Sequence, residues 1–287
     1  MLIRGDITFT ERVMGQIRIV TDEHYTGEGI SQGLARGLLV YYQDCNLTGE
    51  GMGIGSIALR DIHYTYFSRS WTDAVDGEIL IRTFFIDTRM SWSIQEKQVF
   101  LLTRLIEYAT RIYMRLPRAQ KILMIPVFPL RTLLGIHPVF ETISPLGKVR
   151  CTYKVNGNDI EVEVCMEDPL KEHEILFLLN ELSARWFTDG CEKGRQTYQI
   201  PAWERISSVN LPVSLFDPVH RIRFFLNHPS VPDYIPFSVY RGREHTEDLC
   251  WAGFCIQLGP SDTKQILPKV GYRISFSEEK CSSTITT

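Results

Sequence analysis

Alternating apolar and polar positions dominate the chain and predict a protein built mainly from β-strands. Short runs rich in β-branched and aromatic residues recur along the sequence, and Gly, Asp or Ser separates them. The clearest pair flanks Asn156-Gly157, a dipeptide that two-residue hairpin turns prefer. Because strands greatly outnumber helical segments, the pattern indicates antiparallel pairing rather than a series of parallel βαβ units.

Two segments carry a helical period instead. The first, at about 93–116, opens with the capping box formed by Ser93 and Glu96 and has an apolar residue at every third or fourth position. The second, at about 169–188, follows a capping aspartate and has Pro169 in its first turn. We therefore expect a mainly β, α+β fold: an antiparallel β-sandwich or barrel-like assembly with two covering α-helices.

Prolines concentrated near the middle of the chain predict how it is divided. We expect an N-terminal sheet and helix over 1–120, a proline-rich connection over 121–147, a C-terminal sheet and helix over 148–277 and a flexible tail over 278–287. No low-complexity linker separates the two halves, so we expect them to pack as one unit.

Composition and charge narrow the functional classes. The net charge of −3 and the pI near 6.2 give no electrostatic basis for binding nucleic acid or an anionic membrane. The longest apolar stretch, 122–136, is interrupted by two prolines and an arginine, and the charged start predicts no secretion signal. Seven cysteines without a CxxC pair are typical of reduced thiols, so we expect a cytoplasmic protein.

The glycine-rich stretch TGEGMGIGS, residues 48–56, has glycine at every second position. A strand-like segment follows it, whereas a nucleotide-binding glycine loop would open a helix. If the stretch is extended, its four glycines share one face and form a shelf for a ligand ring, a neighbouring side chain or a helix. On the ligand interpretation, Gly51 and Gly53 line a binding site.

The tetrad TGEG occurs twice, at Thr26 and Thr48, which indicates either a duplicated hairpin element or a chance match. Glu28 and Glu50 occupy equivalent positions in the two tetrads. If the tetrads are adjacent, these carboxylates form an acid–base pair of the kind glycosidases use, or they bind a divalent cation. Alternatively, both are surface residues beside turns.

A second cluster of polar residues precedes a strand near residue 250. Arginines suit an anionic group, histidine and acids suit proton transfer near neutral pH, and an adjacent tryptophan suits stacking on a ring. The alternative is a solvated loop whose charges pair locally. We interpret Glu244, His245 and Asp248 as catalytic residues. We interpret Arg241, Arg243 and Trp251 as ligand-binding residues.

A third candidate surface is the segment 64–71. Alternation along this segment places Tyr66 on one face, and Arg69 with an aromatic ring on the other.

The histidines and cysteines show no metal-binding spacing, and no cofactor motif is present, so we expect neither metal nor cofactor.

These features predict a protein that binds a small polar molecule. The first hypothesis is an enzyme acting on such a molecule, for example a carbohydrate, in a cleft of a β-rich fold. The alternatives are a non-catalytic ligand-binding β module and a component of a protein assembly. The oligomeric state is not predicted.

Overall fold

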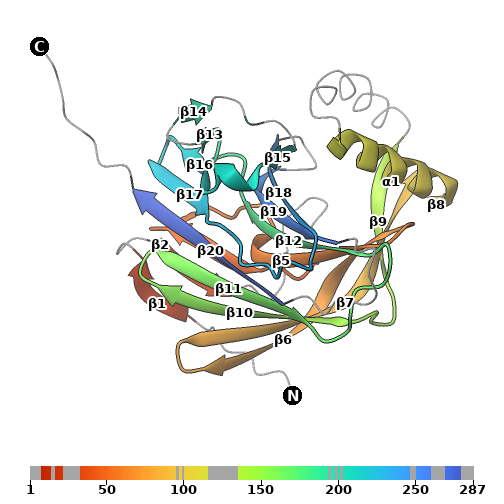
Figure 1. Cartoon of the computed structure of the whole chain (residues 1–287), viewed down its shortest axis with the longest axis horizontal. Coiled ribbons are helices and arrows are strands. Elements are labelled where there is room, and N and C mark those ends of the chain that lie inside the picture. Colours follow the sequence, from red (N-terminus) through yellow and green to blue (C-terminus); the bar gives the residue numbers. More distant parts are fainter. Residues whose placement is uncertain are drawn as a thin grey trace, which may run out of the picture.

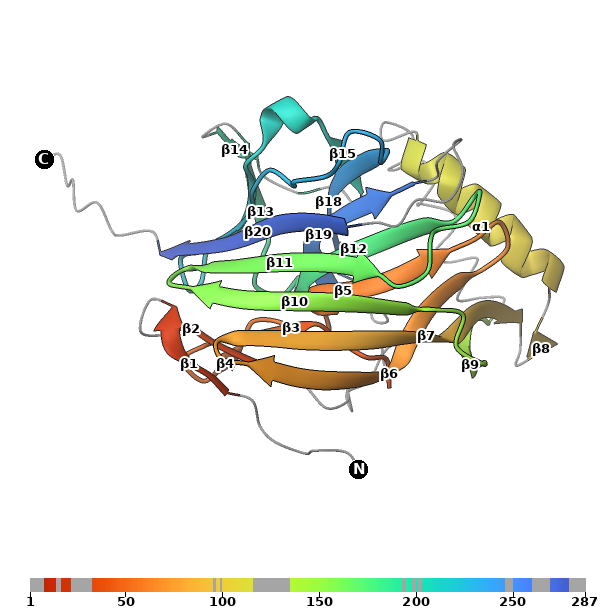
Figure 2. The ribbon, with the colours of Figure 1, turned by 60° about the horizontal axis from the view of Figure 1, so that its bottom comes forward.

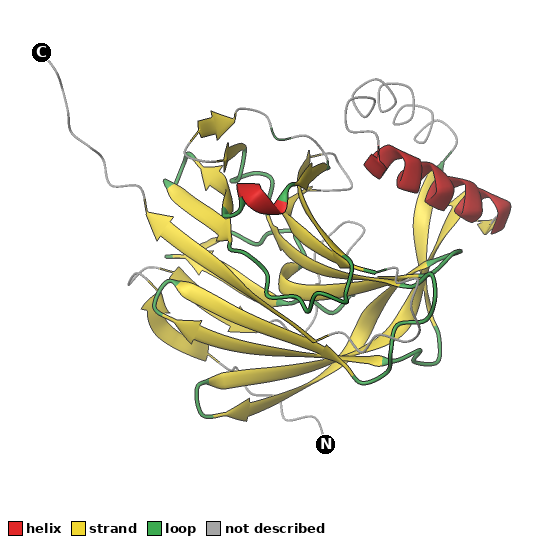
Figure 3. Cartoon of the chain, in the orientation of Figure 1, coloured by secondary structure: helices red, strands yellow, loops and turns green. Residues whose placement is uncertain are grey.

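The computed structural model describes most of the chain. The described residues are 8–13, 17–21, 33–94, 97–98, 100–115, 135–192, 195–197, 200, 203–245, 250–259 and 269–278. Within them, twenty strands join one large antiparallel sheet, and the helical part consists of α1 (Phe100–Arg115) and the short 3₁₀ turn η1 (Ser208–Asn210) (Figure 3). None of the described helices has the length and apolar character that crossing a membrane requires.

The sheet consists of two rows of strands. The first row contains, in order of pairing, β6 (Thr65–Asp76), β7 (Ile79–Ile94), β10 (Lys148–Asn156), β11 (Asp159–Met166), β20 (Lys269–Glu278), β17 (Ile222–Leu226), β16 (Val213–Asp217), β13 (Asp189–Glu192) and β14 (Arg195–Thr197). The second row contains β1 (Thr8–Val13), β2 (Ile17–Thr21), β3 (Leu38–Tyr42), β5 (Gly53–Arg60), β12 (Ile175–Leu182), β19 (Cys250–Leu258), β18 (Phe237–His245) and β15 (Glu204–Ile206). At the margins, β4 (Cys45–Asn46) pairs with β3, and both β8 (Lys97–Gln98) and β9 (Ile136–Thr142) pair with β7.

The two rows meet at one corner, where β5 pairs with β6 at Leu59–Tyr66 and Arg60–Thr65. From there they diverge as two layers, which can be followed along β6, β7, β10, β11 and β20 in one and β5, β12 and β19 in the other (Figures 1 and 2). The sheet is open and does not close into a barrel within the described residues.

The main core lies between these layers, because apolar residues of both rows belong to one buried cluster. Ile57 of β5 and Leu178 of β12 come from one layer, and Tyr153 of β10 and Val162 of β11 from the other. In β10 and β11 buried and more exposed positions alternate, as expected for strands with one solvent-facing side. The predicted hairpin at Asn156-Gly157 is confirmed, since these strands pair up to Asn156 and Asp159.

Of the two predicted helices, the first is only partly confirmed. It begins at Phe100 rather than near residue 93, because Ser93 belongs to the long strand β7. The Ser93 side chain is buried and lies 3.0 Å from Nε2 of His137, which belongs to the paired strand β9. Ser93 therefore supports strand pairing and does not cap the helix. Glu96 lies outside the described residues.

The predicted second helix, at about 169–188, is wrong. Residues 175–182 form β12, which lies between β5 and β19 and is buried along nearly its whole length. A strand covered on both faces has a continuous apolar run without alternation, and such a run resembles a helical stripe.

Strands on either side of the predicted 121–147 connection pair directly, β7 with β10 and β5 with β12. The division into two halves stays a prediction.

A polar network inside the core fixes how β12 pairs with β5. Asn180 Oδ1 accepts hydrogen bonds from the Gly55 backbone N–H at 3.1 Å and from the Tyr272 hydroxyl at 3.0 Å. The Tyr153 hydroxyl donates to the Gly55 carbonyl at 2.9 Å. The register shifts between Leu179 and Asn180, so Gly55 is the extra residue of a β-bulge. The four glycines of 48–56 therefore do not share one face.

Gly55 is required at the bulge. Its φ is +75°, and a Cβ would lie 2.5 Å from Cε1 of the Tyr153 ring. We expect Gly55→Ala to lower the free energy of unfolding by about 2 to 4 kcal/mol, because backbone strain and overpacking add. Gly77→Ala is the matched control, since Gly77 has φ +60° but nothing lies within 4 Å of its Cβ position. It should cost about 1 kcal/mol. Equal losses in chemical denaturation would contradict the packing role of Gly55.

Candidate functional site

The second layer has a buried surface on the side away from the main core. Because successive strand residues point to opposite faces, Asn180 faces the core and Glu181 faces away from it. We call this side of β5, β12, β19 and β18 the Glu181 face. It carries a second buried cluster: Leu34, Met52, Ala58, Phe177, Leu179, Tyr240 and Cys255.

Glycines flank Glu181 across the sheet. Glu181 is opposite Gly53 on β5 and Gly253 on β19, and Gly253 is in turn opposite Gly242 on β18. A Cβ at Gly253 would overlap the Asn180 carbonyl oxygen, so β12 and β19 are packed more closely here than a side chain allows. Across these four strands, Glu181 therefore contributes the one side chain of the row.

The Glu181 carboxyl is strongly perturbed. The residue is 9% exposed, and burial raises its pKa from 4.5 to about 7. The Met52 N–H, which donates to Oε2 at 3.2 Å, lowers the pKa, the charge of Glu244 raises it and that of Arg36 lowers it. A pKa near neutrality makes both the acid and the carboxylate form of Glu181 accessible, which suits proton transfer.

Glu244 is the second carboxylate of this face. On β18, Glu244 is opposite Trp251 of β19. It is two strands away from Glu181 and two residues along β18 from Gly242, which shares the row of Glu181. The Cα atoms of Glu244 and Glu181 are therefore about 12 Å apart. Gly242 and Gly253 lie between them. The two glutamates therefore border the same stretch of bare backbone.

Three aromatic side chains lie beside the carboxylates. Trp203, which immediately precedes β15, has its ring centroid 4.7 Å from that of Trp251 and 6.3 Å from that of Tyr240. Trp203 and Tyr240 belong to the second cluster, and Trp251 is 8% exposed. The arrangement combines a titrating carboxyl, a second acid and flat apolar rings, which are common elements of ligand pockets.

The structure divides the cluster predicted around residue 250 between the two faces. Glu244 and Trp251 lie on the Glu181 face, whereas Arg241, Arg243 and His245 point to the other side. Arg241 is opposite Phe254 of the main core, is 2% exposed and forms an ion pair with Glu204 at 2.7 Å. Arg243 Nη2 donates to the Ala184 carbonyl at 2.9 Å and lies 3.3 Å from Nδ1 of His245. Asp248 lies outside the described residues.

The predicted pairing of Glu28 with Glu50 lies partly outside the described residues, because Glu28 is not among them. Glu50 Oε1 forms an ion pair with Arg185 at 2.6 Å, and Oε2 accepts a hydrogen bond from the Ser183 hydroxyl at 3.5 Å. Glu50 thus joins the turn before β5 to the end of β12. Its catalytic role stays a prediction.

The remaining predicted ligand-binding residues have packing roles in the structure. A Cβ at Gly51 would lie 2.7 Å from the Glu181 carbonyl oxygen, and one at Gly53 would lie 2.6 Å from that of Leu38. The buried Tyr66 donates its hydroxyl to Asp61 at 2.8 Å. Arg69 Nη1 lies 3.4 Å from the Thr142 hydroxyl of β9. Binding of a ligand by these residues stays a prediction.

Sequence reasoning missed Glu181, although a signal was present. The segment ILFLLNEL places two polar residues, Asn180 and Glu181, inside an apolar run. Asparagine and glutamate are seldom buried unless they are paired or functional, so their position in a buried strand marks a candidate site. In the described residues, no group of three or more His, Cys, Asp or Glu side chains is arranged to hold a metal ion.

Comparison with protein-family models and with curated proteins found no match. Among solved structures, the chain is similar to the 4-α-glucanotransferase of Thermococcus litoralis, with a TM-score of 0.40 and 10% identity over 96% of this chain and 38% of that one. It is also similar to the Slr1438 protein of Synechocystis sp. PCC 6803, with a TM-score of 0.40 and 8% identity over 97% of each chain. The chain thus spans little more than a third of the glucanotransferase. These likenesses are too distant to carry an argument about function.

The raised pKa of Glu181 predicts a specific dependence of stability on pH. Between pH 4.5 and about 7 the folded state keeps a proton that the unfolded state loses, so the free energy of unfolding falls as pH rises. Glu181→Gln removes this contribution. The free energy of unfolding of Glu181→Gln minus that of wild type should therefore increase by about 3 kcal/mol from about pH 4 to about pH 8.

Denaturant titrations at a series of pH values measure this difference. The matched control is Glu163→Gln, which removes an exposed carboxylate of β11 that is paired with Lys269 at 3.2 Å. If both variants show the same dependence on pH relative to wild type, Glu181 does not have the raised pKa.

Proposed function

We propose that the chain is an enzyme acting on a polar small molecule such as a carbohydrate, with Glu181 as its proton-transfer group. The observation that carries this proposal is a buried carboxyl with a pKa of about 7, bordered by bare backbone. Proton transfer to or from a reacting group is most effective when the pKa of the catalytic group lies near the working pH. Strongly perturbed carboxyl pKa values are concentrated at functional sites, which supports this role for Glu181.

Glu244 completes an acid–base pair in this proposal. It is more exposed than Glu181, and its charge raises the pKa of Glu181. Two carboxyls in unequal environments can divide the acid and base roles, as they do in enzymes that cleave glycosidic bonds. Glu181 donates a proton to an oxygen of the substrate, and Glu244 supplies the partner carboxylate.

The aromatic residues support a carbohydrate as the substrate. Trp203, which is half-buried and packs against the buried Trp251 and Tyr240, provides a flat apolar surface on which the C–H face of a sugar ring packs, while the carboxylates accept hydrogen bonds from its hydroxyls. Of the residues predicted from the sequence, Glu244 and Trp251 belong to this site. The cysteines given as free thiols, which is typical of a reducing compartment such as the expected cytoplasm, are Cys45, Cys151, Cys165, Cys250 and Cys255.

A non-catalytic binding module is the second candidate, because the same aromatic side chains bind a sugar without converting it. A measurement of substrate turnover distinguishes an enzyme from a binding module. Thermal unfolding of wild type is scanned against neutral sugars, sugar phosphates and sugar acids, and every compound that raises the melting temperature is assayed for conversion.

For a converted compound, we expect Glu181→Gln to lower kcat by at least about 100-fold, because a general acid contributes about 10² to 10⁴ in rate. Glu163→Gln should stay within about twofold of wild type, since this exposed residue lies on the other layer. Full activity in Glu181→Gln would contradict the proposed mechanism. Binding to wild type without conversion would identify a binding module.

A further inference from the structure

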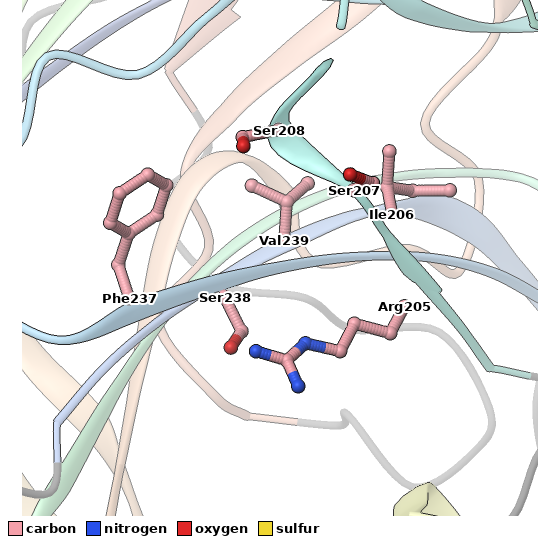
Figure 4. A pocket seen from close by; sticks show the side chains of 7 residues that line it. All are labelled: Arg205, Ile206, Ser207, Ser208, Phe237, Ser238 and Val239. Carbon is pink, nitrogen blue, oxygen red and sulfur yellow. The ribbon is translucent and has the colours of Figure 1, made fainter. Parts of the chain in front are cut away.

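A pocket opens at the edge of the second layer, where β15 pairs with β18. Its volume is about 430 Å³, and it lies between the end of β15, the start of η1 and the first residues of β18 (Figure 4). The lining residues are Arg205, Ile206, Ser207, Ser208, Phe237, Ser238 and Val239.

The lining of the pocket favours an anion. The seven described lining residues include one cation and three hydroxyls but no carboxylate. In Figure 4 the Arg205 guanidinium points toward the Ser238 hydroxyl, while Val239 and Phe237 lie on the other side of the strand. Ser207 and Ser208 lie on the side of Val239 and Phe237, so among these residues the hydroxyl beside the guanidinium is that of Ser238. A guanidinium with a hydroxyl beside it matches the oxygens of a phosphate or carboxylate group.

The pocket adjoins the proposed catalytic site. Arg205 is directly opposite Tyr240, and Ser238 lies two residues before Tyr240, so both belong to the Glu181 face. Across the sheet, Arg205 is three strands away from Glu181, and along the strands it is displaced by two residues. The Cα atoms of Arg205 and Glu181 are therefore about 16 Å apart. Tyr240 lies between them. A sugar ring beside the aromatic side chains thus has the Glu181 carboxyl at one end and Arg205 at the other.

We propose that this pocket binds an anionic group of the substrate, a phosphate or a carboxylate, and that the substrates are therefore acidic carbohydrates. This inference rests on the proposed function, because it assigns the pocket to the same substrate. Arg205 holds the anionic group, Ser238 donates a further hydrogen bond, and the sugar ring extends along the half-buried Trp203 toward Glu181.

The first test measures binding alone, by calorimetry with the full chain at low ionic strength. The probes are inorganic phosphate, glucose 6-phosphate, glucuronate and glucose, so that the phosphate and carboxylate sources are compared with a neutral sugar. We expect at least one anionic sugar to bind at least tenfold more tightly than glucose. Arg205→Gln should remove this preference, and Ser238→Ala should weaken it severalfold.

Arg150→Gln is the matched control, since it removes an exposed arginine from β10, in the other layer. It should leave all four affinities within about twofold of wild type. Equal affinities for glucose and both anionic sugars would overturn the proposal, as would an anion preference that survives in Arg205→Gln.

The failure of this proposal is distinguishable from the failure of the proposed function. An anion preference that depends on Arg205, together with turnover that is unaffected in Glu181→Gln, keeps the pocket and contradicts the catalytic site. Turnover that depends on Glu181 but is the same for neutral and anionic sugars, and unchanged in Arg205→Gln, contradicts the pocket and keeps the catalytic site.

Discussion

The register between β12 and β5 is the constraint on which the candidate site depends. Inside the main core, Asn180 accepts hydrogen bonds from Gly55 and Tyr272, and Tyr153 donates to the carbonyl of Gly55. A buried polar group that loses its partner costs about 1 to 3 kcal/mol, so this network strongly favours one alignment of the strands. A slip by one residue would turn every side chain of β12 to the opposite face and place Glu181 in the core.

The same register explains the state of Glu181. Because Asn180 points inward, Glu181 points to the other buried surface, between Gly53 and Gly253. Its raised pKa expresses the cost of desolvating a carboxylate at that position, and the fold is less stable above neutral pH as a result. The site and the core are thus two sides of one strand, and the packing that orders the core also holds the carboxyl in place.

Local features of the sequence predicted some of these elements and not others. The antiparallel β class and the hairpin at Asn156-Gly157 were predictable because β10 and β11 have one solvent-facing side. Glu244 and Trp251, which stay predicted site residues, were singled out because they lie close together in the chain. β12 resembled a helix since both its faces are covered, which concealed Glu181. The flanking glycines come from β5, β19 and β18. Glu181 is 128 positions from its partner Gly53 and 72 positions from its partner Gly253, and no local pattern encodes such pairings.

A direct titration of the Glu181 carboxyl tests this interpretation most sharply. The carboxyl carbon resonance is followed by NMR from acid to alkaline pH, and it is assigned as the signal that disappears in Glu181→Gln. A midpoint near pH 7 is the result that the buried position beside Glu244 predicts. A midpoint at the ordinary value for glutamate, about 4.3, would show that water reaches the group freely. That result would contradict both its buried position and its proposed role in proton transfer.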